Sequence, residues 1–190
     1  MTTVVPTRRR LLEAARDLVE EGGYAAASVL AVTDRAGLAA GTLYRHFASK
    51  EELFVELFRS VCDREVEEMR AAARAPGQPA TERLVGVLTT FAYRALRRPR
   101  LAWALLAEPV DPAVDAERLL YRARYAGLLA ECLRDAVTAG ELPPQPVDLI
   151  AAALVGGCAE VLVGPLAGAP TESEQTIAAM RQFVLGAVGA

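Results

Sequence analysis

Several residue types that carry common protein chemistry are scarce in this sequence. Its 190 residues include one histidine, three cysteines and one tryptophan, and aromatic residues make up only 6% of the chain. The cysteines, Cys62, Cys132 and Cys158, stand singly in apolar helical patterns with no C-x-x-C pair, which argues against a disulfide framework. Because no signal peptide is recognisable either, we expect reduced cysteines in a cytoplasmic protein.

A metal site or a catalytic centre would have to be built around His46, the single histidine. No Cys, Asp or Glu lies three or four residues from it, as helical metal ligation would require. Nor does the sequence offer a base and an orienting group for a nucleophile. We therefore expect no metal, no cofactor and no enzymatic activity.

Two kinds of hydrophobic pattern are also missing. The longest apolar stretch, residues 149–168, is interrupted by Gly156-Gly157, Glu160 and Pro165, so we expect no membrane span. No segment alternates between apolar and polar residues as a half-buried strand does. What remains is a helical periodicity throughout, which predicts an all-α protein.

The composition is that of a folded chain with an uneven distribution of charge. Hydrophobic residues make up 53% and charged residues 24%, which excludes a disordered chain. Residues 1–50 carry +2, from seven basic and five acidic residues, and so leave –5 for the remainder of a chain whose net charge is –3. The excess positive charge favours a nucleic-acid contact in the N-terminal part. The basic residues there are Arg8, Arg9, Arg10, Arg16, Arg35, Arg45 and Lys50.

The segment 33–47, TDRAGLAAGTLYRHF, carries the most specific pattern in the chain. It predicts the end of a short helix that begins at the N-cap Ser28, a turn at Gly37, and a second short helix that begins near Ala39 or Ala40. Such a pair is a helix-turn-helix, whose second helix can enter a DNA major groove. The same short turn also occurs in helical proteins that do not bind DNA.

The order and spacing of further residues resemble the TetR family of transcriptional repressors. The matching stretches are Ser28-Val29, Ala36-Gly37-Leu38, Gly41-Thr42-Leu43-Tyr44, His46-Phe47 and Ser49-Lys50-Glu51-Glu52-Leu53. The resemblance is dense from about Thr7 to Leu57. It implies a helix-turn-helix DNA-binding domain over residues 1–50 and a helical ligand-binding and dimerisation domain over residues 51–190, with about nine helices in all. It also implies a homodimer that binds a near-palindromic DNA operator, with an affinity altered by a small hydrophobic or amphiphilic effector.

Eight residues are predicted to meet DNA. Arg45 is the candidate for a bidentate contact to guanine, and the methyl groups of Ala40 and Thr42 suit thymine methyls. Gly41 lets the backbone approach the base edges closely. The resemblance implies phosphate contacts for Ser28, Tyr44, His46 and Lys50. Ala39 and Ala40 depart from the family pattern, in which a capping Ser or Thr and then a basic residue are common. The predicted set is Ser28, Ala40, Gly41, Thr42, Tyr44, Arg45, His46 and Lys50. For Arg8, Arg9 and Arg10, a phosphate contact and a solvated basic face both fit the sequence.

The C-terminal part offers candidates for effector binding and for dimerisation. Aromatic and charged residues on apolar helices suit a small-molecule site, but core aromatics and an ion pair of Glu108 with Arg118 or Arg122 explain them equally. These residues are Phe91, Trp103, Glu108, Arg118, Tyr121, Arg122 and Tyr125. The last two helices suit a two-fold interface, although the pattern does not separate an interface from a core within one chain. The residues concerned are Leu154, Val155, Cys158, Val161, Leu162, Ile177, Met180 and Val184.

Two other classes of protein remain open at this point. A helical small-molecule binding protein with weak or lost DNA readout fits the alanines at positions 39 and 40. An all-helical enzyme would have to use a cysteine or the Glu108/Arg122 pair. It is the weaker alternative because a positioned base is missing.

Overall fold

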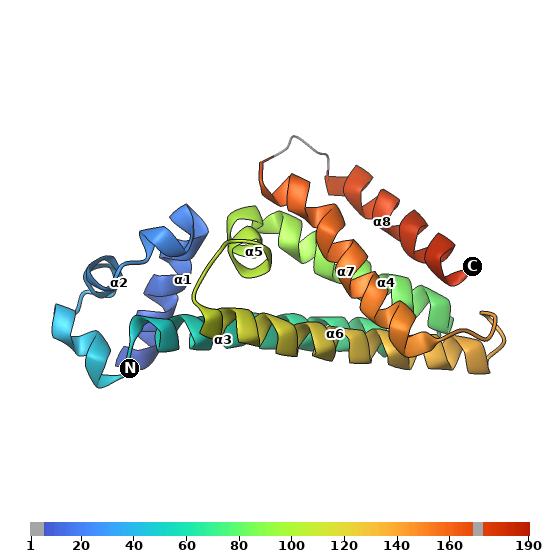
Figure 1. Ribbon diagram of the computed structural model, residues 1–190, viewed down its shortest axis with the longest axis horizontal. Coiled ribbons are helices and arrows are strands. Elements are labelled where there is room, and N and C mark those ends of the chain that lie inside the picture. Colours follow the sequence, from blue (N-terminus) through green and yellow to red (C-terminus); the bar gives the residue numbers. More distant parts are fainter. Residues whose placement is uncertain (1–5, 169–172) are drawn as a thin grey trace. The chain divides into compact units, whose positions relative to one another are not determined.

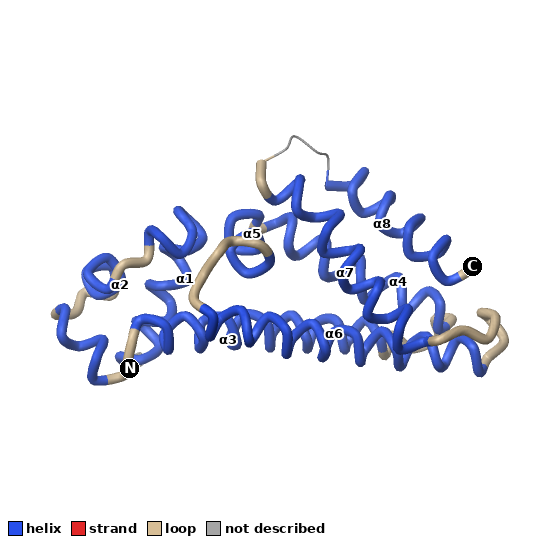
Figure 2. Tube along the Cα trace, in the orientation of Figure 1, coloured by secondary structure: helices blue, strands red, loops and turns tan. Residues whose placement is uncertain are grey.

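The computed structural model describes residues 6–168 and 173–190, and across these residues the chain is entirely helical or loop (Figure 2). Eight α-helices and one 3₁₀ helix, with no strand in the described part, confirm the all-α prediction of about nine helices (Figure 1). In chain order they are α1 (Thr7–Ala26), α2 (Val29–Arg35), η1 (Ala40–Arg45), α3 (Lys50–Ala73), α4 (Ala80–Arg97), α5 (Pro99–Leu106), α6 (Pro112–Thr138), α7 (Val147–Leu166) and α8 (Ser173–Val188).

The chain forms two compact units that do not divide at a single point. Unit 1 comprises residues 1–61 together with residues 100–118, and unit 2 comprises residues 62–99 together with residues 119–190. The helix-turn-helix therefore shares a unit with α5 and the first turns of α6. The family resemblance implied a boundary at residue 50 between a DNA-binding domain and a ligand-binding and dimerisation domain. This boundary divides the chain by function and not by packing, and it remains a proposal.

Ser28, Ser49 and Asp111 are of residue types that favour an N-cap, and the sequence predicts a helix start at each of them. The structure confirms all three caps. The Ser28 hydroxyl accepts a hydrogen bond from the Ala31 amide at 3.1 Å, and the Ser49 hydroxyl accepts one from the Glu52 amide at 3.2 Å. The carboxylate of Asp111 accepts one from the Ala113 amide at 2.8 Å. In each case a side chain satisfies an amide that the first helical turn leaves unpaired.

The turn of the helix-turn-helix is a Schellman motif. Gly37 has φ 64°, a left-handed conformation that glycine adopts without a steric penalty. Its amide donates to the Asp34 carbonyl at 2.9 Å, and the Leu38 amide donates to the Thr33 carbonyl at 2.9 Å. These two bonds satisfy carbonyls at the end of α2 and reverse the chain into η1.

The second helix of the motif is a 3₁₀ helix, η1, which the sequence did not indicate. Ala39 precedes it and has no side-chain group with which to cap it. Gly41, inside this six-residue helix, lowers α-helical propensity. Short segments of this kind commonly adopt the tighter 3₁₀ form. Leu43 and Phe47 are buried, so the segment is held by apolar packing.

Unit 2 is built on the packing of α4, α7 and α8 against one another. Figure 1 shows α7 and α8 side by side, joined by the segment whose residues 169–172 lie outside the described part. Apolar side chains from all three helices form its buried interior, among them Leu84, Leu88, Leu154, Leu162, Met180 and Val184.

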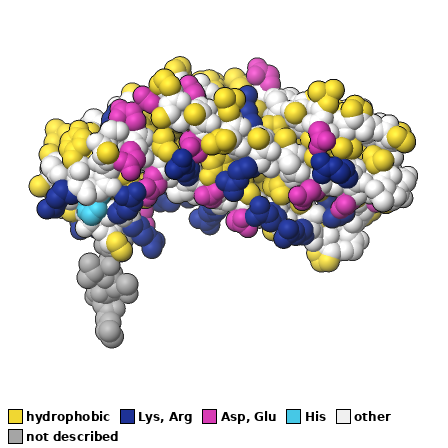
Figure 3. Space-filling model, turned by 60° about the horizontal axis from the view of Figure 1, so that its bottom comes forward, with side chains coloured by type: hydrophobic (Ala, Val, Ile, Leu, Met, Phe, Trp, Pro, Cys, Tyr) yellow, Lys and Arg dark blue, Asp and Glu magenta, His cyan; other side chains and the backbone are white. Residues whose placement is uncertain are grey.

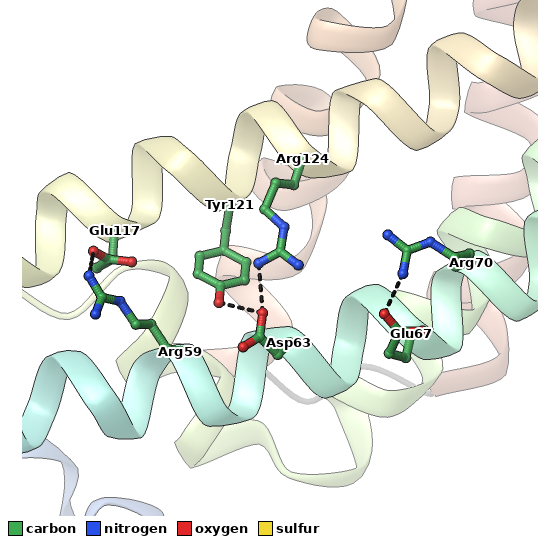
Figure 4. A network of polar contacts seen from close by, with 7 residues as sticks. All are labelled: Arg59, Asp63, Glu67, Arg70, Glu117, Tyr121 and Arg124. Atoms are coloured by element: carbon green, nitrogen blue, oxygen red, sulfur yellow. Dashed lines mark hydrogen bonds and ion pairs between the residues drawn. The ribbon is translucent and has the colours of Figure 1, made fainter.

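Polar side chains connect α3 and α6 within each unit (Figure 4). In unit 1, Arg59 donates to the buried carboxylate of Glu117 at 2.6 Å. In unit 2, Asp63 accepts from the Tyr121 hydroxyl at 2.7 Å and from the Arg124 guanidinium at 2.6 Å. Within each unit, these polar contacts hold α3 against α6.

Glu141 caps α4 from a loop 60 residues away in sequence. Its carboxylate accepts from the Thr81 amide at 2.8 Å and from the Ala80 amide at 3.0 Å. These backbone hydrogen bonds lower the pKa of Glu141 from its ordinary value of 4.5. The stabilisation is therefore complete above the ordinary pKa and is lost as pH falls through the lowered one.

We expect Glu141→Gln to lower the Tm by a few degrees at neutral pH, because an ionised cap at a helix N-terminus is removed. The difference in Tm from the parent protein should shrink as the pH falls from the ordinary pKa of 4.5 through the lowered one, because the parent carboxylate becomes protonated there too. Thermal unfolding followed by circular dichroism across this range measures both effects. Glu131→Gln, which neutralises an exposed acid on α6, is the control, and an equal loss in that variant would contradict the capping role.

Candidate functional site

The outward face of η1 carries most of the residues predicted to meet DNA. Ala40, Gly41 and Arg45 are exposed, and Tyr44 retains 59% of its surface although it is a large aromatic residue. Thr42 differs, because it lies on the inner side and is only 7% exposed. Its side chain is therefore part of the packing, and its predicted contact with DNA is not compatible with this orientation.

The other three predicted residues flank this face. Ser28 is exposed at the start of α2, and its hydroxyl proton remains available as a donor because the oxygen is the acceptor in the cap. Lys50 begins α3, with Nζ 5.0 Å from the centre of the Phe54 ring. His46 is half-buried directly after η1, and its amide donates to the Leu43 carbonyl at 2.9 Å.

Most of the positive charge in the first 50 residues is neutralised within unit 1. Arg35 forms a bidentate pair with Glu21, with both distances 2.8 Å, and this pair lowers the pKa of Glu21. Three further arginines pair with carboxylates, in Arg8–Glu56, Arg9–Glu13 and Arg16–Asp17. In the described residues no ion pair involves Arg10, Arg45 or Lys50. Arg10 donates to the carbonyl groups of Ala36 and Gly37, so Arg45 and Lys50 are the cations left for an anionic partner. Acidic and basic side chains are likewise interspersed on the face seen in Figure 3.

The residues predicted to bind an effector separate into two groups. Phe91, Tyr121 and Tyr125 lie together in unit 2, with ring centroids 5.8 Å apart for Phe91 and Tyr125 and 6.3 Å apart for the two tyrosines. Burial is the main reason that the pKa of each tyrosine is raised, so both phenols remain protonated. Arg122, by contrast, is exposed on α6.

Glu108 and Arg118 belong to unit 1 and have structural partners there. Arg118 donates to the carbonyl groups of Ala104 and Glu108, each at 2.7 Å, and to that of Leu105 at 2.8 Å, which caps the end of α5. The Glu108 carboxylate accepts from the Tyr24 amide at 3.1 and 3.3 Å. The alternative that Glu108 forms an ion pair with Arg118 or Arg122 is therefore not supported. Trp103, half-buried on α5, is the remaining member of the predicted set.

The cysteines do not have the properties of nucleophiles. All three are free and buried. Burial raises the pKa of Cys62 and of Cys158 to about 12, and that of Cys132 to about 11. A thiol is nucleophilic as the thiolate, so the cysteine-based enzyme has no support here. No cluster of three potential metal ligands occurs in residues 6–168 and 173–190.

The predicted interface residues on α7 and α8 divide into a buried and a more accessible set. Val155 and Ile177 are half-buried, and Val161 is exposed. The others, Leu154, Cys158, Leu162, Met180 and Val184, are at most 1% exposed within a single chain. For these five, the alternative of a core within the chain holds.

The opposite face of α7 is accessible and mostly apolar, and its one exposed charge is Glu160. Leu149 is 70% exposed, and Ala152, Ala153, Gly156 and Gly164 follow it on the same side of the helix. Val147–Leu166 is also long and apolar enough to cross a membrane by length and composition alone, which is weak support for such a span. The exposed face was not anticipated, because the periodicity of this nearly all-apolar helix does not indicate which side is buried.

Comparison with known proteins agrees with the arrangement of unit 1. The family model of the bacterial regulatory proteins, tetR family, matches residues 11–57. The HTH-type transcriptional regulator UidR of Escherichia coli strain K12 is 30% identical over 147 residues, which cover 76% of this chain and 73% of that protein. The HTH-type transcriptional repressor KstR of Rhodococcus jostii strain RHA1 is 37% identical over 99 residues, which cover 52% of this chain and 45% of that protein.

The fold extends the similarity along the whole chain. The crystal structure of the transcriptional regulator FadR from Bacillus subtilis in complex with stearoyl-CoA superposes with a TM-score of 0.82 at 19% identity, over 95% of this chain and 98% of that one. The curated relatives are transcriptional regulators and not enzymes. Together with the helix-turn-helix and its exposed second helix, these similarities place the chain in the tetR family of bacterial regulatory proteins.

Proposed function

We propose that this transcriptional regulator is a cytoplasmic repressor that binds a near-palindromic operator as a homodimer and responds to a small hydrophobic or amphiphilic effector. The observation that carries the proposal is the face of η1 on which Tyr44 and Arg45 are exposed while Leu43 is buried beneath them. A tyrosine hydroxyl and a cation without an ion pair, exposed side by side, can both donate to phosphate oxygens, and the guanidinium can also reach a base edge.

Each residue of the proposed DNA surface has a distinct role. Arg45 reads guanine through its bidentate fork, and Gly41 and Ala40 let the helix approach the base edges. Tyr44, Ser28, His46 and Lys50 contact phosphates. Thr42 has no role on this surface because its side chain is buried.

The dimer is proposed to form through the exposed faces of α7 and α8. Leu149, Ala152, Ala153 and Gly156 on α7 lie on one side of that helix, and Phe183 on α8 is 42% exposed. An apolar face of this extent on a folded chain is typical of a protein contact. Two copies of each helix would make an isologous four-helix arrangement. Asp148 and Glu160 make a bilayer a poorer environment for this helix.

The effector is proposed to act by selecting between two states of the dimer. It would bind against the aromatic cluster Phe91, Tyr121 and Tyr125. Binding would favour a state in which the two recognition helices, which are the η1 helices of the two subunits, no longer match adjacent major grooves. The extent of release from DNA then depends on the difference in its affinity for the two states. A long-chain acyl-CoA is a sensible first compound to test, since the Bacillus subtilis neighbour was solved with stearoyl-CoA.

We expect Tyr44→Ala to weaken binding to a duplex selected from a random library by about tenfold or more. The reason is the loss of a phosphate contact in each head, by which we mean the helix-turn-helix part of one subunit. Lys50→Ala should weaken all duplexes alike and reduce the salt slope of log K by about one unit for each head. Fluorescence anisotropy at several salt concentrations measures both.

Tyr93→Ala is the matched control, because Tyr93 is an equally exposed tyrosine on α4 in unit 2. Both head variants should keep the parental Tm and dimer mass. Parental affinity in Tyr44→Ala and Lys50→Ala would refute the assignment of this face to DNA.

A further inference from the structure

Three consecutive arginines in the first turn of α1 have different surroundings. Arg9 has an exposed side chain and pairs with Glu13 one turn along its own helix at 2.8 Å. Arg8 and Arg10 instead reach backbone carbonyls of the helix-turn-helix, 38 and 26 residues further along the chain. The run of basic residues is therefore not one surface.

Arg8 joins the end of η1 to α3. One of its terminal nitrogens donates to the carbonyl of His46, the residue directly after η1. Its Nε donates to Glu56 on α3 at 3.0 Å, and its second terminal nitrogen donates to the other carboxylate oxygen of that residue. The guanidinium carbon lies 4.3 Å from the centre of the Phe47 ring. Every nitrogen donates and one face of the group is covered, which is the geometry of a planar bidentate anchor.

Arg10 performs a similar task at the other end of the motif. A terminal nitrogen donates to the carbonyl of Ala36, the C-cap residue of α2, and lies 3.5 Å from the carbonyl oxygen of Gly37. Carbonyl groups at a helix C-terminus lack partners within the helix. A cation placed there stabilises the helix end and the turn that follows it.

We infer that Arg8 and Arg10 are positioning residues for operator binding, which set the orientation of η1 from inside the head, and that they are not phosphate ligands. The inference rests on the proposed operator binding. Glu56 takes part in the same positioning, because its carboxylate on α3 accepts hydrogen bonds from Arg8.

The test compares Arg8→Ala with Arg9→Ala in the full-length protein, using the selected duplex and a random duplex at several salt concentrations. Arg8→Ala removes the charge-assisted hydrogen bonds at the His46 end of η1, and this should weaken the selected duplex by about tenfold or more. The ratio of selected to random affinity should fall, and the salt slope should stay at the parental value. Arg9→Ala should change neither, apart from a small general electrostatic loss. Arg8→Lys should not restore the ratio, because an ammonium group cannot form the planar fork.

Glu56→Gln separates positioning from phosphate binding even if Arg8→Ala fails to fold. Removal of a negative charge near DNA would by itself strengthen binding. The positioning role instead predicts weaker binding of the selected duplex by about threefold to tenfold at an unchanged salt slope, as one charge-assisted bond is weakened. Glu13→Gln, which removes the partner of Arg9, is the control and should bind at least as well as the parent.

Two results would overturn the inference. One is a fall of about one unit in salt slope for each head in Arg8→Ala, with selected and random duplexes weakened equally, as expected of a phosphate ligand. The other is parental or stronger binding by Glu56→Gln. Both require that the parent protein selects a duplex. A parent protein that selects no duplex would contradict the proposed function. A parent that selects a duplex, combined with either of the two results above, would contradict only the positioning role of Arg8 and Arg10.

Discussion

Replacing Gly156 by arginine is expected to convert the protein into a monomer and to weaken operator binding by about 100-fold or more. Gly156 is exposed on α7, and a Cβ atom at this position would meet no atom within 4 Å. The substitution therefore suits the fold of a single chain and improves helix propensity. In the proposed dimer the two arginine side chains would occupy the contact between the α7 helices, where steric conflict and a desolvated charge together cost about 3–5 kcal/mol. Separate heads also lose the advantage of binding two half-sites together.

Gly127→Arg is the matched control for this substitution. Gly127 also lies exposed inside a helix, on α6, and a Cβ atom added there would likewise have no neighbour within 4 Å. Sedimentation velocity and DNA binding should be parental in this variant, whereas Gly156→Arg should sediment as a monomer with a helical spectrum. A Gly156→Arg protein that remains dimeric at parental affinity would place the interface elsewhere.

Gly23→Ala is expected to lower the free energy of unfolding by about 3–5 kcal/mol, from backbone strain and loss of a buried partner. Gly23 interrupts α1 with φ 74° and ψ –174°, a region almost confined to glycine. A Cβ there would lie 2.7 Å from both carboxylate oxygens of Glu108. The methyl group would displace this carboxylate and leave the Tyr24 amide without its acceptor.

Gly77→Ala provides the control, since Gly77 has φ 73° with open space around it. It should cost about 1 kcal/mol, which is the strain of a positive φ alone. Denaturant unfolding of the full-length protein measures both changes. The double variant Gly23→Ala, Glu108→Ala should lose less free energy of unfolding than the two single variants together. Without the Glu108 carboxylate, the methyl group added at position 23 has no steric conflict with that side chain. If Gly23→Ala costs no more than Gly77→Ala, Glu108 does not hold this segment.

The parts of the fold that the sequence predicted depend on short-range chemistry. Ser28, Ser49 and Asp111 each cap an amide two or three residues away, so the sequence contains both partners. The turn at Gly37 was predictable for the same reason. The 3₁₀ form of η1 was not predictable. The free-energy difference between an α-helix and a 3₁₀ helix of six residues is small and depends on the packing beneath Leu43.

Long-range partners explain what the sequence could not indicate. The sequence left open whether Glu108 binds an effector or pairs with an arginine, but the partner of its carboxylate is the Tyr24 amide, 84 residues away. Arg8 looked like part of a solvated or DNA-facing basic run, yet its contacts lie 38 and 48 residues away. On α7 almost every position is apolar, so only packing against α4 and α8 separates buried Leu154 from exposed Leu149.

Selection of bound sequences from a random duplex library by the purified protein, at low and moderate salt, tests the central claim most directly. A homodimeric regulator with two recognition helices should enrich an inverted repeat, with a steep loss of affinity as salt increases. If Arg45 is the main base-reading side chain, guanine should occupy a fixed position in each half-site. A folded dimer that enriches no sequence, with or without candidate effectors, would contradict the account and favour a helical small-molecule binding protein that has lost DNA readout.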